Sequence, residues 1–144
     1  MRFVFTDGGR AAAGHKKQAR DCVTRSIAIS TGKPYQDVYD ALNALAASER
    51  IGKRKTRRSN SESGVYRQTY QRYLESLGWR WHPTMSIGSG CRVHLRSGEL
   101  PAGRLIVLVS RHITAVIDGV IHDTHDCSRG GTRCVYGYFW HPPR

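Results

Sequence analysis

The chain has 144 residues, the size of one domain and enough to bury a core of its own. A hydrophobic content of 39% excludes a disordered chain, and no apolar run approaches the roughly 20 residues that cross a bilayer. The net charge of +12, from 23 Lys+Arg against 11 Asp+Glu, favours acidic partners, of which nucleic acid is the commonest.

The amino terminus and the cysteines indicate a compartment. Residues 1–7 lack the long apolar stretch of a secretory signal, so we expect a cytoplasmic protein without membrane contact. The four cysteines include no Cys-x-x-Cys pair, and Cys91 has no identifiable partner. In a reducing cytosol we expect all four to be free thiols.

Helical signals dominate the first half of the chain, after a short strand predicted at Arg2–Phe5. Asp21 is a good helix N-cap and Gly32 stands where a C-cap glycine belongs, which predicts a helix over 22–31. Pro34 suits the first turn of a second helix. The apolar stripe of that helix is Val38, Ala41, Leu42 and Leu45.

A strongly basic segment separates the second helix from a third one predicted over 65–77. We expect a mobile loop over 49–63. Its basic residues are Arg50, Lys53, Arg54, Lys55, Arg57 and Arg58. Two interpretations stay open: a solvated loop, or a patch that binds the phosphates of nucleic acid or another acidic partner.

From Trp79 onward the pattern changes to short strands and turns. The predicted strands are 104–109, 113–117, 120–124 and 134–140. Helices followed by an antiparallel sheet predict an α+β fold. We expect a single domain over 1–144, with amino-terminal helices packed on the sheet.

A hairpin brings a histidine and a carboxylate together. Asp118-Gly119 lies between two β-branched runs and predicts a type I′ turn, which needs positive φ at both positions. If the loop is those two residues, Ile117 pairs with Val120. Counting outward puts His112 and Asp123 on one face as diagonal neighbours, within side-chain reach. This register selects Asp123 over the other nearby carboxylates.

A histidine backed by a carboxylate can act as a general base, because the carboxylate fixes the tautomer and stabilises the imidazolium. Cys22 is the matching nucleophile: it follows the predicted N-cap, where the helix dipole and free N–H groups stabilise a thiolate and an oxyanion. The alternatives are a structural histidine and an inert buried thiol. Together, Cys22, His112 and Asp123 predict a catalytic triad.

Two short motifs now carry a family resemblance. The segment 21–35, Asp-Cys-Val-Thr-Arg-Ser-Ile-Ala-Ile-Ser-Thr-Gly-Lys-Pro-Tyr, resembles the nucleophile helix of papain-like cysteine peptidases. Ser110 to Thr124 resembles the part of that family that carries the histidine and the aspartate. The likeness is closest to small bacterial and phage-encoded forms and to bacteriocin-leader peptidases, and it spans residues 14–124.

The resemblance implies a papain-like fold and thiol-dependent cleavage of an amide or thioester in a peptide or protein substrate, in the host cytoplasm if the chain is phage-encoded. It implies no cofactor. The oxyanion-hole side chain of the family is a glutamine ahead of the nucleophile. Gln18 stands four residues before Cys22, while Lys16 occupies the usual spacing, so Gln18 is the candidate for this role.

Other functions stay open beside this one. The same triad serves acyltransferase and transglutaminase-like reactions, and the basic segment suits a nucleic-acid-binding protein without catalysis on the same scaffold. A further set, His122, His125, Cys127 and Cys134, has suitable atoms for zinc. Its spacing matches no compact zinc motif, so we predict no metal.

Overall fold

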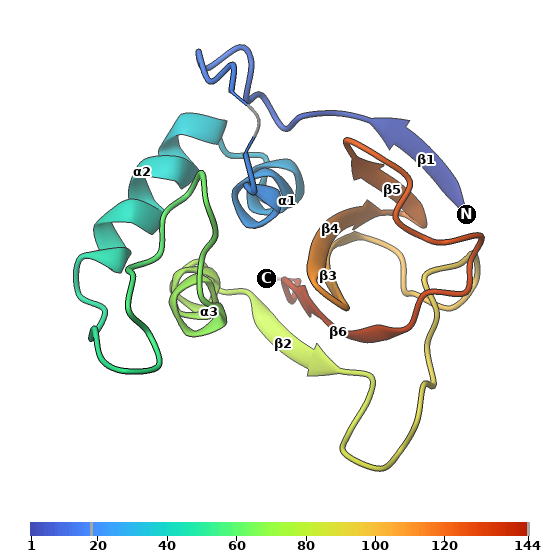
Figure 1. Ribbon diagram of the computed structural model, residues 1–144. Helices are drawn as coiled ribbons and strands as arrows, with labels where there is room; N and C mark the ends of the chain where they lie inside the picture. Colours follow the sequence, from blue (N-terminus) through green and yellow to red (C-terminus); the bar gives the residue numbers. More distant parts are fainter. Residues whose placement is uncertain (18, 144) are drawn as a thin grey trace.

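The computed structural model describes residues 1–17 and 19–143, and in this part of the chain three helices lie on one side of a curved six-stranded sheet (Figure 1). The helices are α1 (Cys22–Thr31), α2 (Tyr35–Ala46) and α3 (Arg67–Ser76). The strands are β1 (Arg2–Phe5), β2 (Arg80–Pro83), β3 (Arg104–Val109), β4 (His112–Ile117), β5 (Val120–Asp123) and β6 (Val135–Trp140). The predicted α+β class is confirmed.

The sheet has the order β1-β5-β4-β3-β6-β2 and is mostly antiparallel. One pairing corrects the expectation of a purely antiparallel sheet: β1 runs parallel to β5, with Phe5 opposite Asp123. A parallel pair needs a long crossover, and here the helices and the rest of the sheet intervene between the two strands. The edge strand β1 therefore lies beside the strand that ends in Asp123.

The end of α1 follows its local signal, whereas the start of α3 does not. Gly32 ends α1 in the left-handed conformation (φ 75°) and donates its N–H to the carbonyl of Ala28, as a C-cap glycine does. Helix α3 begins at Arg67, two residues later than predicted. The backbone of Tyr66 is extended (φ −64°, ψ 144°) and its N–H donates to the hydroxyl of Ser59.

Two serines attach α1 to the sheet by hydrogen bonds. Ser26 Oγ donates to the carbonyl of Ile113 (3.0 Å) and Ser30 Oγ to the carbonyl of Leu105 (2.9 Å). These serines are four residues apart and share one helix face, on which Cys22 is the preceding member of the series. Because Ser26 lies against β4 next to His112, the start of α1 is held at the end of β4 where His112 lies.

Apolar residues pack on both faces of the sheet. On the helical side the fully buried members include Ile27, Val38, Leu42, Leu74, Ile106 and Phe139. On the other side they include Leu95, Val107, Val116, Ile121 and Val135. The sheet is therefore a central layer, covered by helices on one side and by loops on the other.

The structure contains one disulfide in its described part, between Cys91 and Cys134. The expectation of four free thiols is wrong for these two, and Cys91 does have a partner. The two cysteines are 43 residues apart in the sequence, and an antiparallel backbone pairing of His94 with Cys134 brings their segments together. Disulfides form mainly in oxidising compartments, so a cytoplasmic location stays a prediction.

Among the residues that are described, none of the helices is both long and apolar enough to span a bilayer.

Candidate active site

The hairpin between β4 and β5 has the predicted geometry. Its two loop residues, Asp118 and Gly119, both have positive φ (49° and 77°), as a type I′ turn requires. Ile117 pairs with Val120, and the antiparallel register continues outward from this pair. The sequence-based register is thereby confirmed.

His112 and Asp123 meet as that register predicts. His112 Nε2 lies 2.7 Å from Asp123 Oδ2, and Thr114 Oγ1 donates to the same oxygen at 2.7 Å. The other oxygen, Oδ1, accepts from the N–H of Thr124 (2.7 Å) and from Arg25 Nη2 (3.3 Å). Asp123 is only 3% exposed, so these contacts replace the water it lacks.

The contacts keep both members of the pair charged. Burial alone would raise the pKa of Asp123, but hydrogen bonds with His112 and Thr114 hold it well below its usual range. Burial alone would lower the pKa of His112. Hydrogen bonds with Asp123, Cys127 and Cys22 outweigh burial and raise this pKa to about 11. An imidazolium next to a carboxylate is the favoured state.

Cys22, the first residue of α1, is half-buried beside this pair. Burial alone would raise the pKa of its thiol. The side chain and charge of His112, the backbone of Ile113 and the charge of Arg25 outweigh burial and bring this pKa below its ordinary value. Because Nε2 of His112 faces Asp123, Nδ1 is the ring nitrogen left for the thiol. The structure thus brings the three predicted triad residues together.

Asp21 stands at the N-cap position of α1 but does not cap it. Its carboxylate makes no hydrogen bond to the first turn and instead accepts from Arg10 Nη1 (3.1 Å), Tyr35 OH (2.7 Å) and Arg25 Nη1. The first intrahelical bond runs from the N–H of Arg25 to the carbonyl of Asp21 (2.9 Å). Within the described chain, no side chain caps the earlier N–H groups, which leaves them available to an oxyanion near Cys22.

The oxyanion-hole candidate Gln18 lies outside the described residues.

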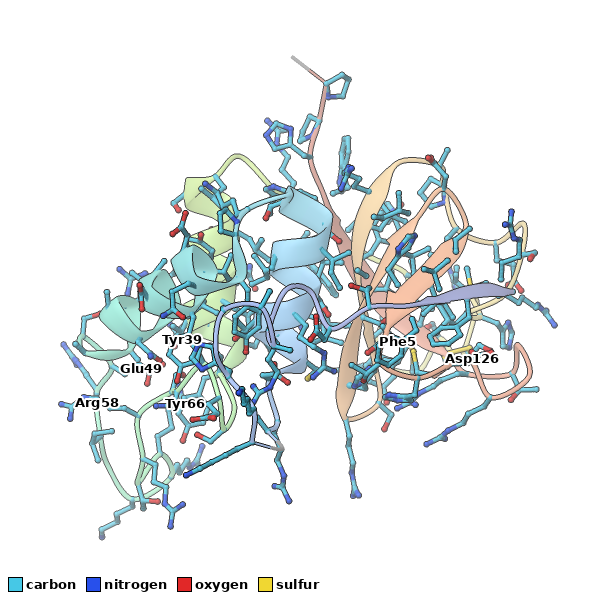
Figure 2. The ribbon with its side chains drawn as sticks, turned by 90° about the horizontal axis from the view of Figure 1, so that it is seen from above. Phe5, Tyr39, Glu49, Arg58, Tyr66 and Asp126 are labelled. Carbon is cyan, nitrogen blue, oxygen red and sulfur yellow. A yellow bond between two sulfur atoms is a disulfide. The ribbon has the colours of Figure 1, made fainter. Side chains whose placement is uncertain are left out.

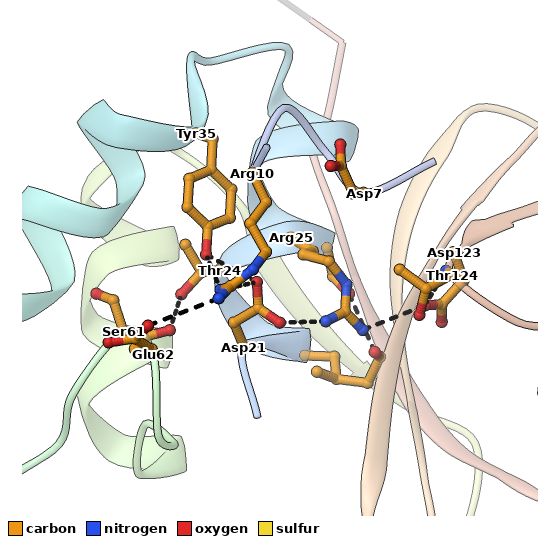
Figure 3. A network of polar contacts seen from close by, with 12 residues as sticks. Asp7, Arg10, Asp21, Thr24, Arg25, Tyr35, Ser61, Glu62, Asp123 and Thr124 are labelled. Atoms are coloured by element: carbon orange, nitrogen blue, oxygen red, sulfur yellow. Dashed lines mark hydrogen bonds and ion pairs between the residues drawn. The ribbon is translucent and has the colours of Figure 1, made fainter. Parts of the chain in front are cut away.

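Two further residues contact Asp123 and had no role in the prediction, Arg25 and Thr114. Asp21, expected only as a helix cap, pairs with Arg25, and Arg10 contacts Asp21 from outside the site. Figure 3 shows the chain of contacts that runs from Arg10 through Asp21 and Arg25 to Asp123. The four-residue spacing of Asp21 and Arg25 on one helix is a signal that could have indicated their pairing. No local signal indicates that Arg10 reaches the same carboxylate.

One group of side chains offers metal-ligating atoms close together. The candidate atoms of His112, Asp123 and His125 all lie within 4.8 Å of one another. Both oxygens of Asp123 already accept hydrogen bonds, and the guanidinium of Arg25 contacts one of them. A cation next to the carboxylate disfavours a second one, so the arrangement suits proton transfer better than metal binding. Cys134, a member of the zinc set considered from the sequence, is held in the disulfide.

The basic segment lies away from the sheet, beyond α2 and α3. Figure 2 shows Arg58, Tyr66 and Glu49 at that end of the molecule, while Phe5 and Asp126 lie on the side of the sheet. Arg50, Lys53, Arg54, Arg57 and Arg58 are exposed, and Lys55 is half-buried with its ammonium 4.8 Å from the ring centre of Tyr66. These basic side chains are thus at the surface, which fits both a solvated loop and a binding patch.

Two surface hollows lie beside this segment. One, of about 370 Å³, is lined by Arg57, Arg58, Ser63, Gly64, Val65 and Tyr66. The other, of about 520 Å³, is lined by Ala19, Arg20, Arg57, Glu62 and Ser63. Because the N–H of Arg20 donates to the carbonyl of Glu62 (2.9 Å), the second hollow adjoins the residues that lead into α1.

Another hollow, of about 530 Å³, lies at the opposite end of α1. It is lined by Ser30, Thr31, Lys33, Leu77, Trp79, Arg104 and His141. Cys22 is nine residues away at the other end of this helix, so this hollow is separate from the triad.

Comparison of the chain with protein-family models, with curated proteins and with solved structures found no match in any of the three.

Proposed function

We propose that the protein is a thiol-dependent hydrolase of papain-like type that cleaves an amide or thioester bond in a peptide or protein. The observation that carries this proposal is the position of His112. Its Nε2 lies 2.7 Å from a buried carboxylate, while the ring also interacts with a cysteine at the start of a helix. This arrangement supplies a nucleophile, a base and a residue that orients the base. The order Cys, His, Asp along the chain agrees with the papain-like resemblance.

In the proposed reaction the resting site holds a thiolate–imidazolium pair, in which the proton of the Cys22 thiol is already on His112, and the thiolate attacks the substrate carbonyl. The tetrahedral intermediate carries a negative oxygen, which the N–H groups of the first turn of α1 stabilise. His112 then returns the proton to the leaving amine or thiol as the carbon–heteroatom bond breaks. A water molecule, deprotonated by the same imidazole, cleaves the resulting thioester and restores Cys22.

Alkylation of Cys22 tests the activated thiol directly. Iodoacetamide should label Cys22 at pH 6, where an ordinary thiol with a pKa of about 8.5 is almost entirely protonated and unreactive. The site of labelling is read by peptide mass spectrometry. A Cys22→Ala variant should lose this labelling and keep its fold by circular dichroism. Labelling of wild type only as fast as an ordinary thiol would contradict the proposal.

Acyl transfer tests the reaction itself. An activated ester such as p-nitrophenyl acetate should release a burst of about one equivalent of nitrophenol and leave an acyl group on Cys22. The matched control is Cys127→Ala, which removes the other free thiol and should keep the acylation on Cys22. Acylation that is lost in Cys127→Ala but kept in Cys22→Ala would contradict the proposal, because it would assign the nucleophile to Cys127.

The same acyl thioester can be passed to an amine instead of water, which is the acyltransferase or transglutaminase-like alternative. Mass spectrometry of the products with a primary amine present separates the two. Mainly acid product supports hydrolysis, and mainly amide product supports acyl transfer.

A second candidate function is binding of nucleic acid by the basic segment. The exposure of its arginine and lysine side chains favours this function, because they are free to contact phosphates. The residues concerned are Arg50, Lys53, Arg54, Lys55, Arg57 and Arg58. Phosphate contacts release counterions, so binding should weaken steeply as salt is raised. Mobility of a short DNA or RNA duplex at low salt, with and without neutral substitutions in this segment, tests it. Unchanged mobility with wild-type protein would exclude this function.

A further inference from the structure

Arg25 connects the two carboxylates that flank the triad. It lies on α1, three residues after Cys22, and only 9% of its surface is exposed. Its Nη1 donates to Asp21 Oδ1, and its Nη2 donates to Asp123 Oδ1 at 3.3 Å (Figure 3). Asp21 is 1% exposed and Asp123 is 3% exposed. One guanidinium therefore bridges the residue before the nucleophile and the residue behind the base.

We propose that Arg25 is a positioning residue of the site: its guanidinium joins the start of α1 to the end of β5 and so holds Cys22 against His112. This inference rests on the proposed function, because it assigns a role within the same triad. A guanidinium has the geometry for it, since its planar fork can donate to two carboxylates at once, whereas the single ammonium of lysine acts as a point charge.

The contacts on Asp123 support this role. Arg25 and the N–H of Thr124 occupy Oδ1, whereas His112 and Thr114 occupy Oδ2. Donors on both oxygens prevent the carboxylate from rotating, and a fixed carboxylate fixes the ring that it contacts. Arg25 thereby acts on Cys22 from two directions, through the orientation of His112 and through its own positive charge.

Other ionisable groups around the triad define what else can titrate there. Burial, together with the negative charge of the nearby Cys22 thiolate, raises the pKa of Tyr70, on α3, to about 12. The Cys127 thiol lies 3.9 Å from Asp123 Oδ2, and the ring centre of His125 lies 5.0 Å from that of His112. Unlike these three neighbours, Arg25 brings a permanent positive charge into contact with Asp123.

Arg10 offers a matched control. It is 8% exposed and pairs with the same Asp21 at 3.1 Å, but its other partners are Tyr35, Glu62 and the backbone of Lys17. A role that is merely structural predicts the same consequences for removing either arginine. A positioning role predicts that only Arg25 changes the chemistry of Cys22.

The experiment compares wild type with Arg25→Gln, Arg25→Lys and Arg10→Gln. The rate of Cys22 alkylation is measured from pH 4 to 9, and folding is checked by circular dichroism. For Arg25→Gln we expect the half-maximal pH to rise by about one unit, which slows labelling about tenfold on the acidic side. Arg25→Lys should fall between this variant and wild type. Arg10→Gln should keep the wild-type pH dependence although its thermal stability falls.

The outcomes separate this inference from the proposed function. An ordinary thiol profile in wild type would overturn the activated cysteine itself. A low half-maximal pH in wild type with the same value in Arg25→Gln would overturn only the role of Arg25, as would an equal shift in Arg10→Gln. If Arg25→Gln does not fold, Arg25→Lys decides: labelling indistinguishable from wild type overturns the bridging role, and slower labelling supports it.

Discussion

Arginines in two regions of this molecule differ in burial and therefore in how their charges act. Arg10 and Arg25 are buried and each contacts a carboxylate, whereas Arg57 and Arg58 are exposed on the basic segment (Figure 2). A buried charge requires a partner, and changes in that partner alter the pKa values of nearby groups. An exposed charge is solvated and acts on distant partners through a field that salt screens. The same residue type therefore holds a buried network of charges together in one place and stays free in solvent in the other.

The largest effect expected from breaking the buried region is on the reactivity of Cys22. His112→Ala removes the imidazole that accepts the thiol proton, so labelling of Cys22 at pH 6 should fall about 10²–10⁴-fold. The rate of iodoacetamide labelling measures this. The matched control is His125→Ala, which removes the exposed neighbouring ring and should retain labelling. Equal loss in both variants would contradict the assignment of His112 as the base.

Stability should respond strongly to Asp21→Asn. Asp21 is the shared partner of Arg10 and Arg25, so its removal leaves two buried guanidiniums with less compensation. Breaking a buried ion pair costs about 3–5 kcal/mol. Urea denaturation measures this loss against Asp40→Asn, whose exposed carboxylate on α2 should change stability by less than about 0.5 kcal/mol. Similar losses in the two variants would contradict the buried network.

The charge pair predicts a pH dependence of stability with a definite sign. The raised pKa of His112, about 11, stabilises the fold below about pH 6.5, and this contribution is lost as pH rises from there toward 11. The lowered pKa of Cys22 acts in the opposite direction, because it adds stability as pH rises toward the ordinary thiol value. Asp123 adds stability above about pH 4 that is lost on acidification below it.

Replacing Cys22 by serine removes the opposing thiol contribution. The free energy of unfolding of Cys22→Ser should therefore decline above about pH 6.5, by at most about 1.4 kcal/mol per pH unit from this histidine. Urea denaturation from pH 5 to 9 measures the slope. The additional change His112→Gln should flatten it, and a slope that survives this change would assign the dependence to other groups.

The smallest effects on stability are expected in the exposed region. Arg57→Ala and Arg58→Ala should each change the free energy of unfolding by less than about 0.5 kcal/mol, because the side chains are solvated in both states. Their effect should instead appear in nucleic-acid binding, where each lost phosphate contact reduces the salt slope by about 1. Unchanged affinity and salt slope in the double variant would exclude these arginines from such an interface.

Several features could be predicted because their determinants are local. Gly32 marks the end of α1, and the apolar stripe of α2 marks the face that it buries. Asp118-Gly119 fixes a two-residue turn. That turn sets the register, and the register is sufficient to place His112 next to Asp123. Serine hydroxyls that bond across to strand carbonyls, as Ser26 does, have no such signature.

The amino-acid sequence by itself determined the class of secondary structure and the hairpin that places His112 next to Asp123, since each depends on residues close together in the chain. Tertiary structure alone decided that β1 pairs parallel with β5, that Cys91 bonds to Cys134, and that Arg25 reaches Asp123 across 98 residues. Such contacts form only when packing repays the entropy of closing a long loop, and that balance is a property of the whole fold.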